Sequence, residues 1–121
     1  FSLLFRALAD WLIGLDKSLR ILFKKVAVME QWLARWQLRL RRDNIGNQAR
    51  AAAMNTINAL YIPRNHIVES VIKAAEQEGD YAPFKQFLQV LNNPYEKREG
   101  LEAYSSLAPS SFFSYRTYCG T

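Results

Sequence analysis

Three arginines at helical spacing are the residues of this sequence that most directly suggest binding chemistry. Arg35, Arg39 and Arg42 would share one side of a helix, with Arg41 nearby. A nucleic-acid reader uses clustered arginines to neutralise phosphates and exposed aromatic side chains to stack on bases. Here the neighbouring tryptophans fall at core spacing on the opposite side of the helix. The pattern therefore favours a solvated face that docks on another protein segment, and it does not favour nucleic acid as the partner.

His66 is the only histidine in the chain. A zinc site needs three or four ligands, and no cysteine or second histidine lies close to it in sequence. A catalytic base needs a nucleophile and an orienting group, and neither is found near His66. With Arg64 and Asn65, His66 is therefore predicted to join the start of a helix to a neighbouring segment through hydrogen bonds.

The acidic residues at the end of the same helix are the next candidates for chemistry. Glu76, Glu78 and Asp80 have a spacing that fits surface and capping roles. The chain contains no glycine-rich phosphate loop, no paired acid dyad and no Ser/His/Asp set. We therefore predict no catalytic residue, no metal ligand and no cofactor site within these residues.

Cys119 is the only cysteine, so the chain cannot form an internal disulfide. A single cysteine is typical of a reducing compartment, and we expect the cytoplasm. A thiol near the end of a chain is accessible to oxidants or to another thiol. The alternative is an inert thiol packed against Phe112, Phe113 or Tyr115.

The composition is that of a globular chain with one hydrophobic core. Of the 121 residues, 50% are hydrophobic and 22% are charged. Residues 1–50 carry ten Lys or Arg and four Asp or Glu, whereas residues 51–121 carry six and seven, so the net charge of +5 arises in the first part. The apolar segment 1–15 is too short to span a bilayer, and no membrane partner is expected.

The apolar residues recur three and four positions apart and predict an all-α fold: an irregular bundle of five to six helices. We expect a single domain over residues 1–121, with a helical core over 1–93 and a mostly irregular, extended tail over 94–121. Gly14 should end the first helix, and Asp16 should cap the second. Whether the second and third helices form one bent helix stays open. The expected inward faces are Phe1, Leu4, Leu8, Trp11 and Leu12; Leu19, Leu22, Phe23 and Val26; Trp32, Leu33, Trp36 and Leu40; Phe84, Phe87, Leu88 and Leu91.

The segment from Ile62 to Asp80 carries the clearest helix signals. Pro63 suits a first helical position, Gly79 suits a left-handed C-terminal residue, and Asp80 can cap the next helix. One apolar stripe runs along this helix and is predicted to be buried: Ile67, Val68, Val71, Ile72 and Ala75.

An ordered set of short motifs runs from Asn55 to the end of the chain. The motifs are Asn55 and Asn58, Ile62-Pro63-Arg64-Asn65-His66, Val68-Glu69, Gly79-Asp80, Pro83-Phe84, Val90-Leu91, Asn93-Pro94-Tyr95 and residues 115–121. Together they resemble the C-terminal part of the selenoprotein O family, kinase-like proteins that transfer AMP to other proteins. Two positions depart from the family pattern: Ala59 stands where a proline is expected, and a single Pro109 stands where a pair is usual.

The resemblance implies a parent protein that transfers AMP from ATP, with magnesium, to hydroxyl groups of protein substrates. Its nucleotide and metal residues belong to a kinase-like portion upstream, and none maps onto a motif here. The chain opens at Phe1 without an initiator methionine, so we expect a C-terminal fragment that packs on that portion and exposes apolar surface without it. The resemblance also implies a redox or regulatory role for Cys119. The alternative function is a free-standing helical module that binds acidic partners or RNA through the arginine face.

Overall fold

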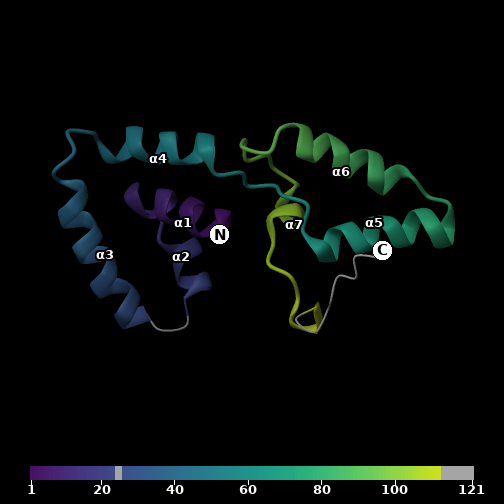
Figure 1. The fold of residues 1–121 in the computed structure, drawn as a ribbon, viewed down its shortest axis with the longest axis horizontal. Helices are drawn as coiled ribbons and strands as arrows, with labels where there is room; N and C mark the ends of the chain where they lie inside the picture. The colour runs from purple at the N-terminus through teal and green to yellow at the C-terminus, as the bar shows by residue number, and fades with distance from the viewer. Residues whose placement is uncertain (24–25, 113–121) are drawn as a thin grey trace, which may run out of the picture. The chain divides into compact units, whose positions relative to one another are not determined.

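The computed structural model describes residues 1–23 and 26–112, and these residues are entirely helical or irregular, without a strand (Figure 1). The all-α prediction is therefore confirmed. The described elements are α1 (Ser2–Leu12), α2 (Lys17–Leu22), α3 (Val26–Leu40), α4 (Asn47–Ile57), α5 (Asn65–Glu78), α6 (Ala82–Asn92), α7 (Glu102–Ser105) and the 3₁₀ helix η1 (Ser110–Phe112).

The chain forms two compact units, residues 1–60 and residues 61–121. Each unit has its own buried side chains, and each is described separately below. The single domain over 1–121, with its core over 1–93 and its tail over 94–121, stays a prediction.

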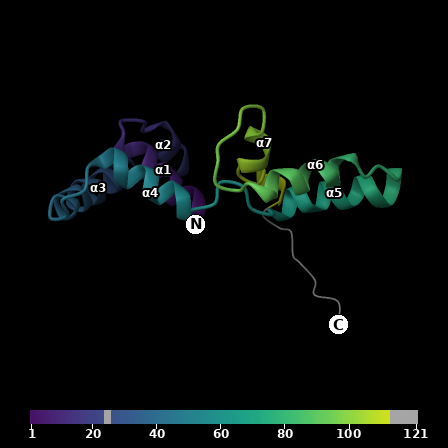
Figure 2. The same ribbon diagram turned by 90° about the horizontal axis from the view of Figure 1, so that it is seen from above.

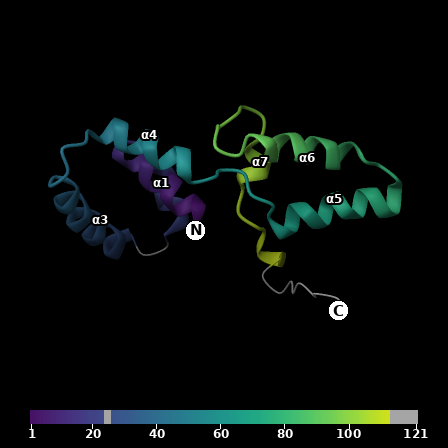
Figure 3. The same cartoon turned by 45° about the horizontal axis from the view of Figure 1, so that its top comes forward.

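In the first unit, α1 packs against α4 and α2 (Figure 3). One buried cluster joins α1 to α2 and α3 through Leu8, Leu19 and Leu33. Small residues let α1 and α4 approach closely, because Ala9 and Ala51 are both buried where these helices meet. The first unit is therefore built around the apolar side of α1.

Two arginines close helix ends in this unit. Arg6 donates from Nη1 to the carbonyls of Asn55 and Asn58, at 3.0 and 3.3 Å, where α4 ends. Arg50 donates from Nη2 to the carbonyl of Leu40, at 3.2 Å, where α3 ends. The last carbonyls of a helix lack intrahelical partners and carry partial negative charge. A guanidinium there donates hydrogen bonds to these carbonyls and balances their charge.

The structure corrects several details predicted for this unit. Asp16 precedes α2, but its carboxylate accepts a hydrogen bond from Arg20 Nε instead of capping the helix. That bond, with the attraction of the Asp16 charge, raises the pKa of the Arg20 guanidinium. The open question about the second and third helices is answered, because α2 ends at Leu22 and α3 begins at Val26. Gly14 follows α1 with a φ of 88°, as expected for a residue that ends a helix.

The inward faces were predicted only in part. Leu8, Leu19 and Leu33 are buried, but the expected core residue Phe1 is almost fully exposed. Phe23 is 37% exposed, and Trp32 is 43% exposed. Periodicity placed Trp32 and Leu33 on one broad inward face, whereas the neighbouring helices cover only the side that carries Leu33.

In the second unit, α5 and α6 form a helical hairpin and lie side by side (Figure 2). Ile67 and Val71 of α5 pack with Phe87 of α6, and Tyr104 of α7 stacks on the Phe87 ring with centroids 5.7 Å apart. The predicted burial of Val71 is confirmed. The predicted burial of Ile72 is wrong, because its side chain is 43% exposed.

On α6 the same kind of correction applies. Phe84 and Leu88, both expected to face inward, are exposed, while Val90 is buried although it was not assigned to the inward face. The buried side of α6 is thus rotated toward Phe87 and Val90 relative to the prediction. The side that carries Phe84 and Leu88 faces solvent in the described structure.

The ends of α5 are defined by local backbone geometry. The helix begins at Asn65, with Arg64 extended before it, so the prediction that Pro63 occupies the first helical position is wrong: Pro63 lies two residues before it. It ends at Gly79, whose φ of 64° is left-handed, as predicted. Asp80 then accepts a hydrogen bond from the Ala82 amide at 2.9 Å and supports the start of α6.

The segment after α6 is tied to the second unit by Tyr61 and Arg98. The buried Tyr61 hydroxyl accepts a hydrogen bond from the Arg98 amide at 3.0 Å, and the Arg98 guanidinium carbon lies 5.3 Å from the centre of the Tyr61 ring. Arg98 also donates from Nη2 to the carbonyls of Val90 and Asn93, at 2.8 and 3.1 Å. Part of the predicted irregular tail therefore contributes to the packing of this unit.

Candidate functional site

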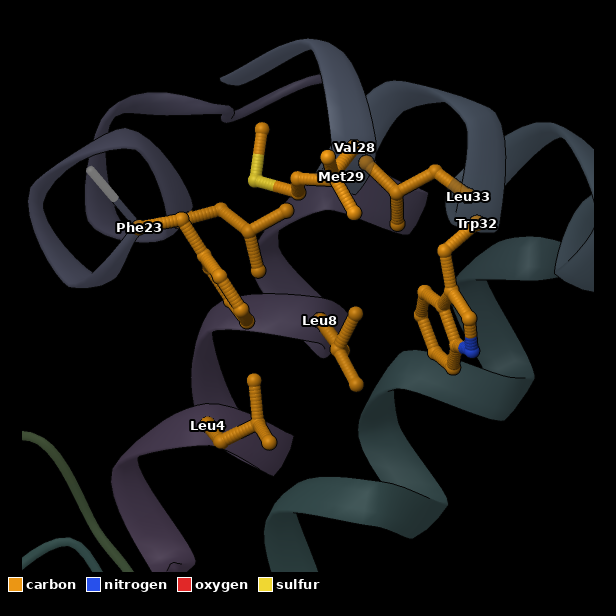
Figure 4. A pocket seen from close by; sticks show the side chains of 8 residues that line it. Leu4, Leu8, Phe23, Val28, Met29, Trp32 and Leu33 are labelled. Carbon is orange, nitrogen blue, oxygen red and sulfur yellow. The ribbon is translucent and has the colours of Figure 1, made fainter. Parts of the chain in front are cut away.

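An apolar hollow of the first unit lies between α1, α2 and α3 and has a volume of about 390 Å³ (Figure 4). Its lining residues are Leu4, Leu8, Leu19, Phe23, Val28, Met29, Trp32 and Leu33. The only hydrogen-bonding side-chain group among them besides the weak thioether of Met29 is the indole N–H of Trp32. In Figure 4, Leu8 of α1 and Trp32 of α3 project toward one another across the hollow.

The α3 helix contributes part of the wall of this hollow and carries arginines beyond it. Val28, Trp32, Arg35 and Arg39 follow each other at three- or four-residue spacing, so they lie along one side of α3. All four are exposed, and we call them the α3 stripe. The Trp32 indole stacks on that of Trp36, with centroids 5.5 Å apart, which holds Trp32 at the edge of the hollow. The stripe thus changes from apolar to basic along the helix.

The arginines singled out from the sequence differ in their surroundings. Arg39 lies 4.0 Å from Asp43 in an exposed ion pair, while Arg35 takes part in no ion pair among the described residues. Arg42 lies in the turn after α3, which ends at Leu40, so helical spacing does not fix its direction. The structure therefore keeps Arg35 and Arg39 together on the helix and places Arg42 beyond it.

His66 occupies a half-buried position at the start of α5. Its ring contacts the Phe112 ring edge-on, with centroids 6.0 Å apart, and its Nδ1 has no hydrogen-bond partner within the described part of the chain. Arg64 likewise has two buried nitrogens, Nε and Nη2, without a partner there. Burial lowers the pKa of the Arg64 guanidinium. These atoms do not make the hydrogen bonds predicted for the helix start, and His66 is held by a ring contact.

The predicted carboxylate group is a surface feature. Glu76, Glu78 and Asp80 lie at the end of α5 and just beyond it, and Asp80 supports the start of α6. Across residues 1–23 and 26–112, no three His, Cys, Asp or Glu side chains gather closely enough to hold a metal ion. Cys119 lies outside the described residues.

A second apolar hollow, of about 330 Å³, lies on the α5–α6 hairpin. Its lining residues are Val68, Val71, Ile72, Phe84, Phe87, Leu88 and Leu91. The apolar residues that were wrongly expected in the core, Ile72, Phe84 and Leu88, therefore line an open groove on this hairpin. Sequence periodicity predicted that these residues face inward, but the pairing of the two helices decides that they face outward.

None of the helices in the described ranges has the length and apolar character needed to cross a membrane.

Comparison with known proteins identifies the family. The model of the family described as protein adenylyltransferase SelO matches residues 9–92. Over the whole chain, the sequence is 40% identical to the protein nucleotidyltransferase YdiU of Sphingopyxis alaskensis, 39% identical to that of a Bradyrhizobium species and 40% identical to that of a Mycobacterium species. The chain spans 25%, 25% and 23% of the lengths of these relatives. Because the family model matches more than half of the chain, as the motif resemblance predicted, the chain belongs to the SelO family of protein adenylyltransferases.

Proposed function

We propose that this chain is the C-terminal helical part of a protein adenylyltransferase, which transfers AMP from ATP to hydroxyl groups of other proteins with the help of magnesium. The match to the SelO family over residues 9–92 carries this proposal. The chain spans about a quarter of the relatives it matches, so the chemistry would belong to the remaining portion of a longer protein.

In this proposal the chain supports the kinase-like portion and contributes no catalytic residue. Among residues 1–23 and 26–112, no three His, Cys, Asp or Glu side chains gather closely enough to hold a metal ion, and the sequence contains no glycine-rich loop that fits ATP phosphates. No step of AMP transfer is therefore assigned to a residue of this chain. The apolar hollows of both units are available for packing.

The test compares the longer protein encoded with this sequence and the 121-residue chain alone. Both are incubated with magnesium, protein substrate and ATP labelled at the α-phosphate. We expect label on protein with the longer protein and none with the chain alone, which should also show no binding of ATP in calorimetry. Magnesium-dependent ATP binding by the 121-residue chain would contradict this division of labour. A longer protein that leaves no label on any protein would contradict the activity itself.

We also propose, from the family resemblance, that Cys119 is a redox-regulatory residue. Oxidation would join its sulfur to that of a cysteine in the kinase-like portion, and the two thiols would pass two electrons and two protons to a thiol oxidant such as oxidised glutathione. We expect Cys119 to react readily with a thiol reagent in the native chain and the longer protein to change activity on oxidation. Equal activity of the oxidised and reduced longer protein would refute regulation, and a Cys119→Ser variant should show that equality.

A second candidate, an independent module that binds acidic partners or RNA, rests on one observation. Trp32 is exposed and shares the α3 stripe with Arg35, so an aromatic ring lies one helical turn from an arginine that forms no ion pair among the described residues. Titration with single-stranded RNA at increasing salt tests the RNA form of this candidate. Binding that weakens steeply with salt and is lost in Arg35→Ala would support it.

A further inference from the structure

The hollow between α1, α2 and α3 has the size of a ligand pocket but not its chemistry. Its volume of about 390 Å³ lies within the range of small-molecule sites. Such sites place a few converging polar groups among apolar walls to orient the ligand. Here the indole N–H of Trp32 is the one strong donor on the lining side chains, and no charged group lines the wall. An apolar side chain of another protein segment fits this wall better than a small molecule does.

Part of the wall of the hollow is exposed to solvent. Val28 is 63% exposed, and Phe23 and Trp32 are partly exposed. Exposed apolar side chains that line one hollow form an apolar patch of the kind typical of a surface that contacts another protein. The patch is formed by two segments, because Phe23 follows α2 while Val28 and Trp32 lie on α3.

The positive charge beside the apolar patch favours a partner with acidic side chains. Residues 1–60 carry ten Lys or Arg against four Asp or Glu. Arg20 is already paired with Asp16 and lies 3.9 Å from Glu30, whereas Arg35, one helical turn beyond Trp32, has no such partner among the described residues. A partner with apolar side chains toward Val28 and Trp32 and carboxylates toward Arg35 would match both halves of the α3 stripe.

We propose that the α2–α3 surface, lined by Phe23, Val28, Trp32 and Arg35, is the docking site of an acidic amphipathic helix. This helix would come from the part of the longer protein outside these 121 residues. The relatives are about four times as long as the chain, and this part of the proposal rests on the proposed function. A helix suits a groove of this kind because residues at i, i+3, i+4 and i+7 present apolar side chains on one side.

Photocrosslinking in the longer protein tests where the surface docks. A benzoylphenylalanine placed at Val28 should crosslink to one upstream segment that combines apolar and acidic residues at helical spacing. The same probe at Ile57, an exposed apolar residue of α4, serves as control and should not crosslink to that segment. Crosslinks from Val28 to residues 61–121, to a second copy of the protein or to bound RNA would overturn the proposal.

A charge reversal tests the role of Arg35. In the longer protein, Arg35→Glu should lower the Val28 crosslinking yield about tenfold, because it places like charges against the partner carboxylates. Arg41→Glu makes the same charge change one residue beyond α3 and should reduce the yield less than about twofold. In the 121-residue chain alone, both variants should melt within a few degrees of the unmodified chain, because both side chains are exposed. Equal yields for the two variants would refute the electrostatic half of the proposal.

AMP transfer measured on the same preparations separates the two proposals. A longer protein that transfers AMP but gives no upstream crosslink from Val28 would refute the docking site and leave the function intact. Upstream crosslinking without AMP transfer would support the docking site and count against the proposed function.

Discussion

Arginine side chains close the C-terminal ends of three helices, and this changes how the basic charge of the chain should be understood. Arg6 serves α4, Arg50 serves α3 and Arg98 serves α6, each by donating to backbone carbonyls. These guanidinium groups satisfy acceptors that would otherwise need water. The net charge of the sequence therefore overstates the basic surface available to a partner, and Arg35 is more informative than the total.

Tyr61→Phe tests the link between the start of the second unit and the segment that follows α6. The change removes the hydroxyl that accepts the Arg98 amide and leaves that amide without its partner. We expect a loss of about 1–3 kcal/mol in the free energy of unfolding, measured with urea. Tyr81→Phe is the matched control, because Tyr81 is exposed, and it should cost less than about 0.5 kcal/mol. Equal effects of the two changes would show that the Tyr61 hydroxyl contributes nothing particular.

Val71→Asp and Ile72→Asp test the buried side of α5. Val71 is 7% exposed, so a carboxyl there must stay protonated, which at neutral pH costs about 4 kcal/mol against an ordinary pKa of about 3.9. This cost is a large share of the roughly 5–15 kcal/mol that stabilises a domain, so much of the helical signal in circular dichroism should be lost. Ile72→Asp should retain a fold, because its side chain reaches solvent.

The pH dependence of the Val71→Asp variant gives an independent check. Burial raises the pKa of the introduced carboxyl above its value in the unfolded chain, so the destabilisation should be smallest below about pH 4 and grow as the pH rises. A Val71→Asp protein that melts at neutral pH within a few degrees of the unmodified chain would contradict the assignment of Val71 to the buried side of α5.

At the scale of elements, the α5–α6 hairpin depends on the turn between its helices. Gly79 adopts a left-handed backbone that ends α5, and the Asp80 carboxylate then supports the first amide of α6. The two devices lie next to each other, so the reversal of chain direction is specified locally. The pairing of α5 with α6 in turn decides that Val71 and Phe87 are buried while Ile72, Phe84 and Leu88 line an open groove.

Gly79→Ala isolates the backbone contribution to this turn. A Cβ at Gly79 would meet no atom within 4 Å, so the cost is conformational and not steric. We expect a loss of about 1–2 kcal/mol, measured by thermal or urea unfolding, because a residue with a Cβ is disfavoured at this positive φ. Gly79→Asn should lose less, since asparagine tolerates the left-handed conformation. A Gly79→Ala variant as stable as the unmodified chain would show that the turn does not depend on a left-handed residue at this position.

At the scale of the whole molecule, tryptophan fluorescence can test the single domain predicted from the sequence. All three tryptophans, Trp11, Trp32 and Trp36, lie in the first unit, so their fluorescence reports the unfolding of residues 1–60. If the chain is one cooperative domain, Ile67→Ala in the second unit should lower the midpoint of the tryptophan transition as well as the helical transition. An unchanged tryptophan midpoint beside a lowered helical one would show that the units unfold separately.

The sequence by itself determined the helical class, the family and two of the points where the chain turns. Gly14 and Gly79 were identified correctly because a left-handed residue is a local requirement that glycine meets. The ordered motifs around Ile62–His66 were sufficient to indicate the SelO family, and the match to the family model confirms it.

The tertiary structure alone decided which apolar residues are buried and what the arginines do. Val71 and Ile72 are adjacent apolar residues on one predicted stripe, and only the position of α6 makes one of them core and the other surface. Trp32 and Leu33 were separated in the same way by the helices around α3. Arg6 and Asn58 are 52 residues apart, and no local pattern reveals that Arg6 donates a hydrogen bond to the Asn58 carbonyl at the end of α4. Periodicity describes a helix in isolation, whereas burial and long-range hydrogen bonds depend on which neighbours pack against it.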